Sequence, residues 1–159
     1  MKIREKISQT LMEVGDKLQE IKDEWCIIGS SALILSDVSN EETFDIDILT
    51  TKVGSDNFQR SLKEYIEVTP KTKEDHLFRS DFARFNFPLM DIEIMGGLQV
   101  KKDGIWQDVI IEHFREIAIG NMSVKVPTLE EQKRLFLLFG REKDLKRVSL
   151  CEQNISKKL

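Results

Sequence analysis

Two short stretches of this chain alternate apolar and acidic residues in the same way. Residues 44–48 read Phe-Asp-Ile-Asp-Ile, and residues 90–94 read Met-Asp-Ile-Glu-Ile. Successive side chains of a β-strand point to opposite faces, so each stretch predicts a strand with one apolar and one acidic face. If the two strands are neighbours in one sheet, up to four carboxylates share one patch: Asp45, Asp47, Asp91 and Glu93.

Crowded carboxylates predict a bound cation. Two unit charges about 4 Å apart repel by roughly 4 kcal/mol at an effective dielectric constant near 20. Oxygen ligands of this kind suit Mg²⁺ or Mn²⁺ better than zinc. The competing interpretation is the solvated face of an antiparallel sheet, where alternating acids are common. Asp is disfavoured in strands and neither stretch contains a cation, which favours the metal site.

A tight turn precedes the first acidic strand. The apolar residues 25–28 end at Gly29, Ser30 follows in the position of a helix N-cap, and residues 32–35 favour a helix. Glycine lets the backbone approach a ligand closely, and free N–H groups at a helix start suit a phosphate. The spacing is neither that of a P-loop nor that of a dinucleotide-binding fingerprint.

The order of strand, Gly29-Ser30 turn, short helix, Asp45-x-Asp47 strand and later acidic strand resembles the nucleotidyltransferase superfamily of the DNA polymerase β type. It is most similar to the small stand-alone members. The resemblance covers roughly residues 25–146 and includes the segments 78–80, 126–130 and 140–144. The segment 93–96, Glu-Ile-Met-Gly, resembles the third-carboxylate strand of these members, which favours Glu93 over Asp91. The spacer from Ser30 to Asp45 is slightly longer than usual.

The resemblance implies transfer of a nucleoside monophosphate from a nucleoside triphosphate to a hydroxyl group, with a pair of Mg²⁺ or Mn²⁺ ions. Asp45 and Asp47 would bridge both ions. Glu93 would complete the site and accept the proton of the attacking hydroxyl. Asp91 would support Glu93 or substitute for it as a metal ligand.

Four further residues are candidates for binding the nucleotide. The resemblance implies that Gly29 and Ser30 hold the β- and γ-phosphates. Arg79 is a candidate phosphate clamp, because a guanidinium matches phosphate bidentately, although an exposed arginine before a strand is an equally good interpretation. In relatives the Arg-x-Lys-Asp segment lies near the nucleotide, which makes Lys143 a candidate phosphate contact.

The expected fold is α/β (α+β): a small mixed sheet with helices packed on one face, a nucleotidyltransferase-type core and C-terminal helices. A chain of 159 residues with 40% hydrophobic residues can form one such domain. We expect an N-terminal amphipathic helix over residues 1–23, a catalytic core over 25–126 and a C-terminal helical segment over 128–159. Inside the core we expect a helix near 55–66, a loop over 70–80, and separate strands over 82–87, 90–95, 98–101 and 122–126.

Turn and helix-cap signals predict where several strands and helices of the C-terminal half begin and end. Lys102-Asp103-Gly104 predicts a hairpin turn. Thr128 with Glu131 predicts a capping box at a helix start, and Gly140 predicts the end of that helix.

Composition narrows the functional class of the protein and its expected location in the cell. A net charge of −4 argues against a general nucleic-acid binder. The two cysteines lack metal-type spacing, and we find no signal peptide and no apolar run of membrane-spanning length, so a cytoplasmic protein is expected. The acceptor is left open as a small molecule, an RNA end or a protein. It would be held by this domain alone, by a second subunit of a homodimer or by a partner protein.

Three other functions compete with the transferase. The first is a catalytically silent nucleotide-binding or antitoxin-like partner module of the same fold. The second is a metal-dependent nuclease, although the Glu-x-Lys pattern of such enzymes is missing at Glu93. The third is a plain binding protein with an acidic sheet face.

Overall fold

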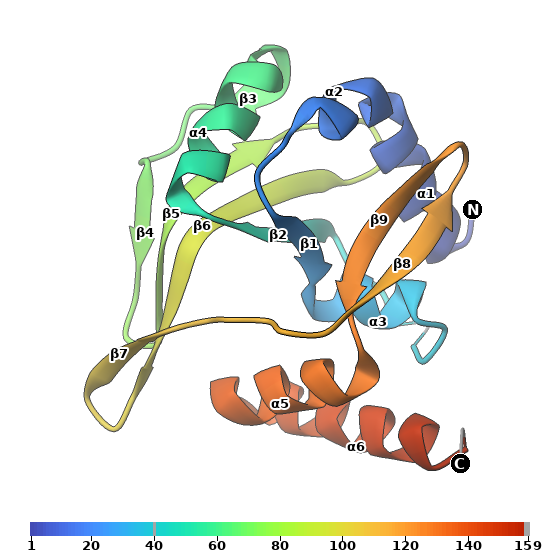
Figure 1. Ribbon diagram of the computed structural model, residues 1–159, viewed down its shortest axis with the longest axis vertical. Coiled ribbons are helices and arrows are strands. Elements are labelled where there is room, and N and C mark those ends of the chain that lie inside the picture. The colour runs from blue at the N-terminus through green and yellow to red at the C-terminus, as the bar shows by residue number, and fades with distance from the viewer. Residues whose placement is uncertain (40, 158–159) are drawn as a thin grey trace.

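The computed structural model describes residues 1–39 and 41–157 (Figure 1). Its helices are α1 (Ile3–Glu13), α2 (Gly15–Glu20), α3 (Gly29–Leu35), α4 (Lys52–Ser61), α5 (Leu129–Phe139) and α6 (Glu142–Lys157), with the 3₁₀ turn η1 (Lys63–Tyr65). Its strands are β1 (Trp25–Ile28), β2 (Asp45–Thr50), β3 (Ile66–Glu67), β4 (Thr72–Glu74), β5 (Phe78–Phe85), β6 (Asp91–Lys102), β7 (Ile105–Asp108), β8 (Phe114–Ile119) and β9 (Met122–Pro127).

A mixed, mostly antiparallel sheet forms the centre of the molecule. Its main path has the order β1-β2-β6-β5-β3, with β4 paired to β5 and β7 paired to β6. The two acidic strands β2 and β6 are parallel neighbours, whereas β1 and β5 run antiparallel to them on either side. Strands β8 and β9 form a separate hairpin.

One face of the sheet carries the main hydrophobic core. Ile46 and Ile48 of β2 and Ile92 and Ile94 of β6 point into this core. The amphipathic stripe of α1 and α2 packs there together with residues of α3 and α4, because the apolar side chains of a strand all leave on the same face. The acidic side chains of β2 and β6 must therefore leave on the opposite face.

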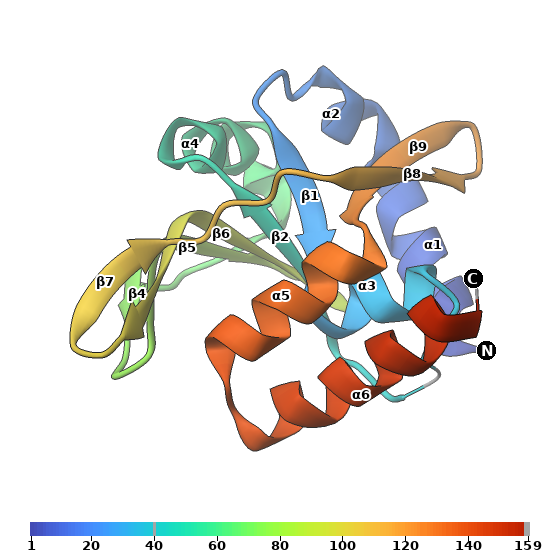
Figure 2. The same ribbon diagram turned by 60° about the horizontal axis from the view of Figure 1, so that its bottom comes forward.

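The C-terminal helices α5 and α6 lie side by side (Figure 2), and residues of both line one cavity with acidic residues of β2 and β6. Neighbouring residues of β1 divide between the two faces: Ile27 joins the main core, and Ile28 packs in a second cluster with Leu135 and Phe139 of α5. Helix α6 is tied to α3 through a third cluster that includes Leu33 and Val148. Helices α5 and α6 thus wall off part of the acidic face.

The predicted class is confirmed, with differences in individual elements. The helix expected over 1–23 is divided at Val14 into α1 and α2. The loop expected over 70–80 contains β4 and the start of β5. The strands expected over 90–95 and 98–101 form one strand, β6, because its two glycines permit continuation. A Cβ on Gly96 would lie 2.6 Å from Ser55 of α4, and Gly97 has a φ of 59°.

Strand β8 was not predicted, although its alternating Ile117 and Ile119 and the following Gly120-Asn121 turn are typical of a hairpin. The predicted turn at Asp103-Gly104 is confirmed, with both residues at positive φ. Thr128 caps α5 by accepting a hydrogen bond from the Glu131 N–H, and Gly140 ends the helix in the left-handed conformation. Within the described ranges, no helix has both the length and the apolar character needed to cross a membrane.

Candidate functional site

The parallel register of β2 and β6 brings the four predicted carboxylates together. Asp45 lies opposite Asp91, and Asp47 lies opposite Glu93. Neighbouring strands are about 4.8 Å apart, so each pair brings two acids into close proximity on one face. The sequence predicts this patch only on the condition that the strands are neighbours, and the structure meets that condition.

The Gly29-Ser30 turn adjoins this patch from the side of β1. Gly29 has a φ of 71°, and a Cβ at this position would lie 3.2 Å from Oδ2 of Asp47. Ser30 is not the N-cap of α3, since that position belongs to Ile28. Its hydroxyl is instead 2.7 Å from the hydroxyl of Thr43, just before β2. The turn and the acidic strand are thus joined by direct contacts.

A cavity of about 400 Å³ lies between this face of the sheet and the C-terminal helices. Three of the four predicted carboxylates line it: Asp45, Asp47 and Glu93. Gly29 and Ser30 line it as well. Asp91 does not, so the cavity distinguishes the two candidates for the third carboxylate and favours Glu93.

Burial and mutual repulsion perturb the acids of this cavity. Desolvation, followed by the charges of Glu93 and Asp45, raises the pKa of Asp47 to about 7. The pKa of Glu93 is also raised, first by desolvation and then by the charge of Asp45. Such acids favour a positive charge among them, and their oxygens are the hard ligands that Mg²⁺ and Mn²⁺ take. The donor chemistry therefore fits the expected cation.

The arrangement of these donors, however, is not that of a finished metal site. Over residues 1–39 and 41–157, no three acidic, histidine or cysteine side chains are grouped so that they could hold a metal ion. Arg84 of β5 lies opposite Glu93 in the sheet and forms ion pairs with Glu93 and Asp45. Arg84 was not predicted from the sequence. Its position two residues after Phe82 in a strand beside the acidic ones is the signal that could have identified it.

The cations that line the cavity come from β4, from α6 and from the residue before α6. Lys143, the candidate phosphate contact, is among them, together with Lys73, Arg141 and Arg147, which were not predicted. Asp144 organises two of them. Its carboxylate, fully buried, accepts hydrogen bonds from Arg141 and also pairs with Arg147 at 3.8 Å.

Arg79 lies elsewhere. Its Nε donates a 2.6 Å hydrogen bond to Gln99, and its guanidinium stacks 4.4 Å from the centre of the Trp106 ring. Arg79 lines a small separate cavity rather than the acidic one. These two partners hold the side chain on the far part of β6 and β7, so the interpretation of Arg79 as a phosphate clamp at the acidic site gains no support.

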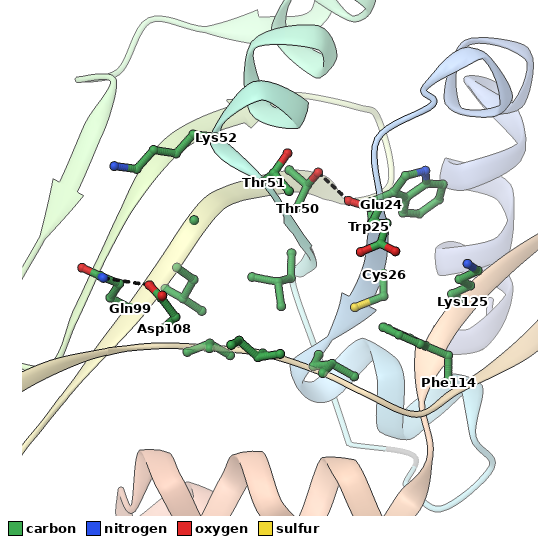
Figure 3. Close-up of a pocket in the computed structure, with 16 residues that line it drawn as sticks. Glu24, Trp25, Cys26, Thr50, Thr51, Lys52, Gln99, Asp108, Phe114 and Lys125 are labelled. Carbon is green, nitrogen blue, oxygen red and sulfur yellow. Dashed lines mark hydrogen bonds between the residues drawn. The ribbon is translucent and has the colours of Figure 1, made fainter.

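A second large cavity lies further along the same sheet (Figure 3). It has a volume of about 440 Å³ and lies between β1, the ends of β2 and β6, and the segment that leads from β7 to β8. Figure 3 shows Glu24 and Lys125 at one end and the hydrogen-bonded pair Gln99 and Asp108 at the other. Leu98 lines both cavities, and the second contains no carboxylate of β2. The acidic cavity is therefore the one with the groups needed for phosphate chemistry.

Comparison with known proteins identifies the family. The family model described as aminoglycoside-2''-adenylyltransferase matches residues 10–149, which includes both acidic strands, the turn and the Arg141–Asp144 segment. The chain belongs to this nucleotidyltransferase family. The predicted relationship to nucleotidyltransferases is confirmed, as is the assignment as an enzyme of this type. A search of curated proteins gave no significant match.

Solved structures of nucleotidyltransferases share the fold. The Thermotoga maritima nucleotidyltransferase-type protein TM1012 superposes with a TM-score of 0.77 at 23% identity, over 99% of this chain and 96% of its own. The antibiotic-resistance factor ANT(2'')-Ia gives 0.61 at 9% identity, over 93% and 83%. The lincosamide adenylyltransferase LnuA, solved with lincomycin bound, gives 0.55 at 16% identity, over 91% and 95%. At these identities the likenesses establish the fold.

Proposed function

We propose that this nucleotidyltransferase moves AMP from ATP to a hydroxyl group of a small molecule, with Mg²⁺ or Mn²⁺ bound to Asp45, Asp47 and Glu93. The observation that carries the proposal is the convergence of these three carboxylates beside the Gly29-Ser30 turn in one cavity. The family description and the printed names of two structural relatives support adenylyl transfer to an antibiotic-type acceptor.

The triphosphate would lie between the turn and the C-terminal helices. The backbone of Gly29 and the Ser30 hydroxyl would bind two of its phosphates, and Arg141, Lys143 and Arg147 would balance its negative charge. Exposed Phe44 lines the same cavity and would offer a flat apolar surface to the base, while the buried Phe136 and Phe139 form part of the apolar wall.

The acceptor would enter from the side of β5 and β4. An in-line displacement requires the attacking hydroxyl opposite the leaving pyrophosphate. Glu93 lies on β6, one strand further from Gly29 than Asp47, so it is placed to receive the proton of a hydroxyl on that side. The hydroxyl oxygen bonds to the α-phosphorus, the bond to pyrophosphate breaks, and the proton passes to Glu93. A metal ion held by Asp45, Asp47 and Glu93 would supply charge neutralisation at the phosphates and would lower the pKa of the hydroxyl.

The first test is thermal unfolding with Mg²⁺, with each of the four common nucleoside triphosphates, and with both together. A ligand at about 100 times its dissociation constant adds roughly 2.7 kcal/mol to the free energy of unfolding, which raises the Tm by several degrees here. We expect a Mg²⁺-dependent shift with ATP that is lost in Asp47→Asn. Equal Tm values with and without every triphosphate would overturn the proposal.

The second test is pyrophosphate release from ATP with candidate acceptors, namely an aminoglycoside and lincomycin, with Asp47→Asn as the control. Release that depends on the acceptor would identify its class. If the protein binds ATP but releases no pyrophosphate with either acceptor, the alternative of a catalytically silent nucleotide-binding module is favoured.

A further inference from the structure

Arg84 lies among four carboxylates near the N-terminal ends of the acidic strands β2 and β6. Its guanidinium forms a hydrogen-bonded ion pair with Glu93 and lies 3.5 Å from Asp91 and 3.7 Å from both Asp45 and Glu67. Three strands supply these acids: β2, β6 and β3. Burial by itself lowers the pKa of Arg84, but the combined charges of the four acids outweigh it and raise the pKa above its ordinary value.

The four acids form two pairs. Asp45 and Glu93 line the acidic cavity, whereas Asp91 and Glu67 do not. The guanidinium therefore bridges two carboxylates that the proposed cation needs and two that it does not. A guanidinium has five N–H donors in a rigid fork and does not lose its proton, so it can satisfy several acids at once at any physiological pH.

We propose that Arg84 is a positioning residue that serves as the internal counter-ion of the metal-free site. It holds Asp45 and Glu93 before a cation binds. When a divalent cation takes these two carboxylates, Arg84 keeps Asp91 and Glu67 and so stays in place beside them. This inference rests on the proposed function, in that the cavity is assumed to take a divalent cation.

Two consequences follow for the site. Arg84 competes with the cation for Glu93, so its positive charge lowers the affinity for the cation. Arg84 also fixes the orientation of the Glu93 carboxylate before a cation binds. Asp91, whose place among the metal ligands was left open by the sequence, becomes the outer anchor of Arg84.

The experiment measures Mn²⁺ binding by calorimetry, without nucleotide, in the wild type, Arg84→Gln and Arg84→Lys. Removing a positive charge about 6 Å from a divalent ion should tighten binding by about tenfold even at the dielectric constant of water. Arg84→Lys keeps the charge and should stay within about threefold of the wild type. Arg60→Gln, an exposed change on α4 with the same loss of charge, should stay within about twofold.

A second pair of variants covers the case in which Arg84→Gln does not fold. Glu67→Gln removes an outer anchor on a half-exposed side chain, which leaves Arg84 more firmly on Glu93. We expect Mn²⁺ affinity to fall about threefold relative to Glu64→Gln, an exposed acid nearby in the chain that pairs with Lys17.

The outcomes separate this inference from the proposed function. Unchanged or weaker Mn²⁺ binding in folded Arg84→Gln would overturn the role of Arg84, and so would equal affinities for Glu67→Gln and Glu64→Gln. Absence of Mn²⁺ binding in the wild type and in all variants would overturn this inference alone, because the proposed function also allows the cation to bind together with ATP, which the thermal unfolding test measures.

Discussion

Gly29, the residue directly after β1, lies so close to Asp47 of β2 that a Cβ on Gly29 would lie 3.2 Å from Oδ2 of Asp47. The φ of 71° at Gly29 belongs to the left-handed region, which favours glycine. The backbone of the turn and the central carboxylate of the site are therefore positioned together. A side chain at residue 29 would disturb both.

We expect Gly29→Ala to lower the free energy of unfolding by about 1–2 kcal/mol, the cost of a left-handed alanine. It should also weaken Mg²⁺-dependent binding of ATP, because the new methyl group displaces the Asp47 carboxylate. Denaturant unfolding and the ATP-dependent shift in Tm measure the two effects. Gly104→Ala is the matched control, since Gly104 has a φ of 79° with open space around its Cβ position, and it should show the loss of stability alone. An undiminished ATP shift in Gly29→Ala would contradict the role of this contact.

The raised pKa values of Asp47 and Glu93 predict an unusual pH dependence of the metal-free protein. An acid whose folded pKa is raised to about 7 holds its proton more tightly in the folded than in the unfolded state, where the value is near 3.8. Its contribution to stability is fully present below pH 3.8 and is lost as the pH rises through 7. We expect the Tm without metal to fall from pH 5 to pH 8 by on the order of 5 °C.

Asp47→Asn should flatten this pH profile and raise the Tm at pH 8, because the neutral amide removes the repulsion. The pKa of Glu131 is lowered to about 2, mainly by its hydrogen bond with Arg134. The contribution of Glu131 to stability is therefore lost only below pH 4.5, outside the range of this measurement. Thermal scans in the presence of a chelator check the prediction. A profile that Asp47→Asn leaves unchanged would show that these acids titrate normally.

Glu93 and Asp91 should differ strongly in their effect on transfer. Loss of a general base costs roughly 10²–10⁴-fold in rate, so Glu93→Gln should lower kcat by at least about 100-fold. Asp91 lies outside the cavity and pairs with Arg84 at 3.5 Å, so Asp91→Asn should cost less than about tenfold. Pyrophosphate release at saturating ATP measures both. The reverse order of the two effects would assign the third carboxylate to Asp91.

Asp144 should couple stability to nucleotide affinity. Asp144→Ala removes the buried partner of Arg141 and Arg147, and we expect it to cost about 2 kcal/mol of stability and about tenfold in ATP affinity. Glu131→Ala is the control: it breaks the ion pair of another buried acid, with Arg134, outside the acidic cavity. It should lose similar stability and bind ATP normally. Calorimetry of ATP binding to both variants distinguishes positioning of the arginines from a general loss of stability.

Local sequence signals predicted the elements on which the site depends. The alternation at 44–48 and 90–94 falls on β2 and β6, except that Phe44 is exposed and lines the acidic cavity instead of joining the apolar face. The glycine turn at 29, the capping residue Thr128 and the helix end at Gly140 lie in the expected structures. Each signal works within a few residues, since side-chain direction in a strand and the φ of a glycine are local properties. The boundaries expected at 1–23 and 70–80 were wrong, because the first helix is divided at Val14 and the expected loop contains β4 and the start of β5.

The sequence by itself therefore determined which strands have an acidic face, where a phosphate-type turn lies and which residue caps a helix. The resemblance of its motifs to nucleotidyltransferases indicated the family. Only the tertiary structure decided the rest: that Asp47 lies opposite Glu93, that Arg84 lies among four acids, and that Asp91 and Arg79 lie outside the cavity. It also decided that Arg141, just before α6, and Arg147 of α6 line the cavity. The physical reason is distance along the chain. The register of β2 against β6 and the docking of α5 and α6 join segments more than 40 residues apart, and such contacts are fixed by the packing of the whole core rather than by any local pattern.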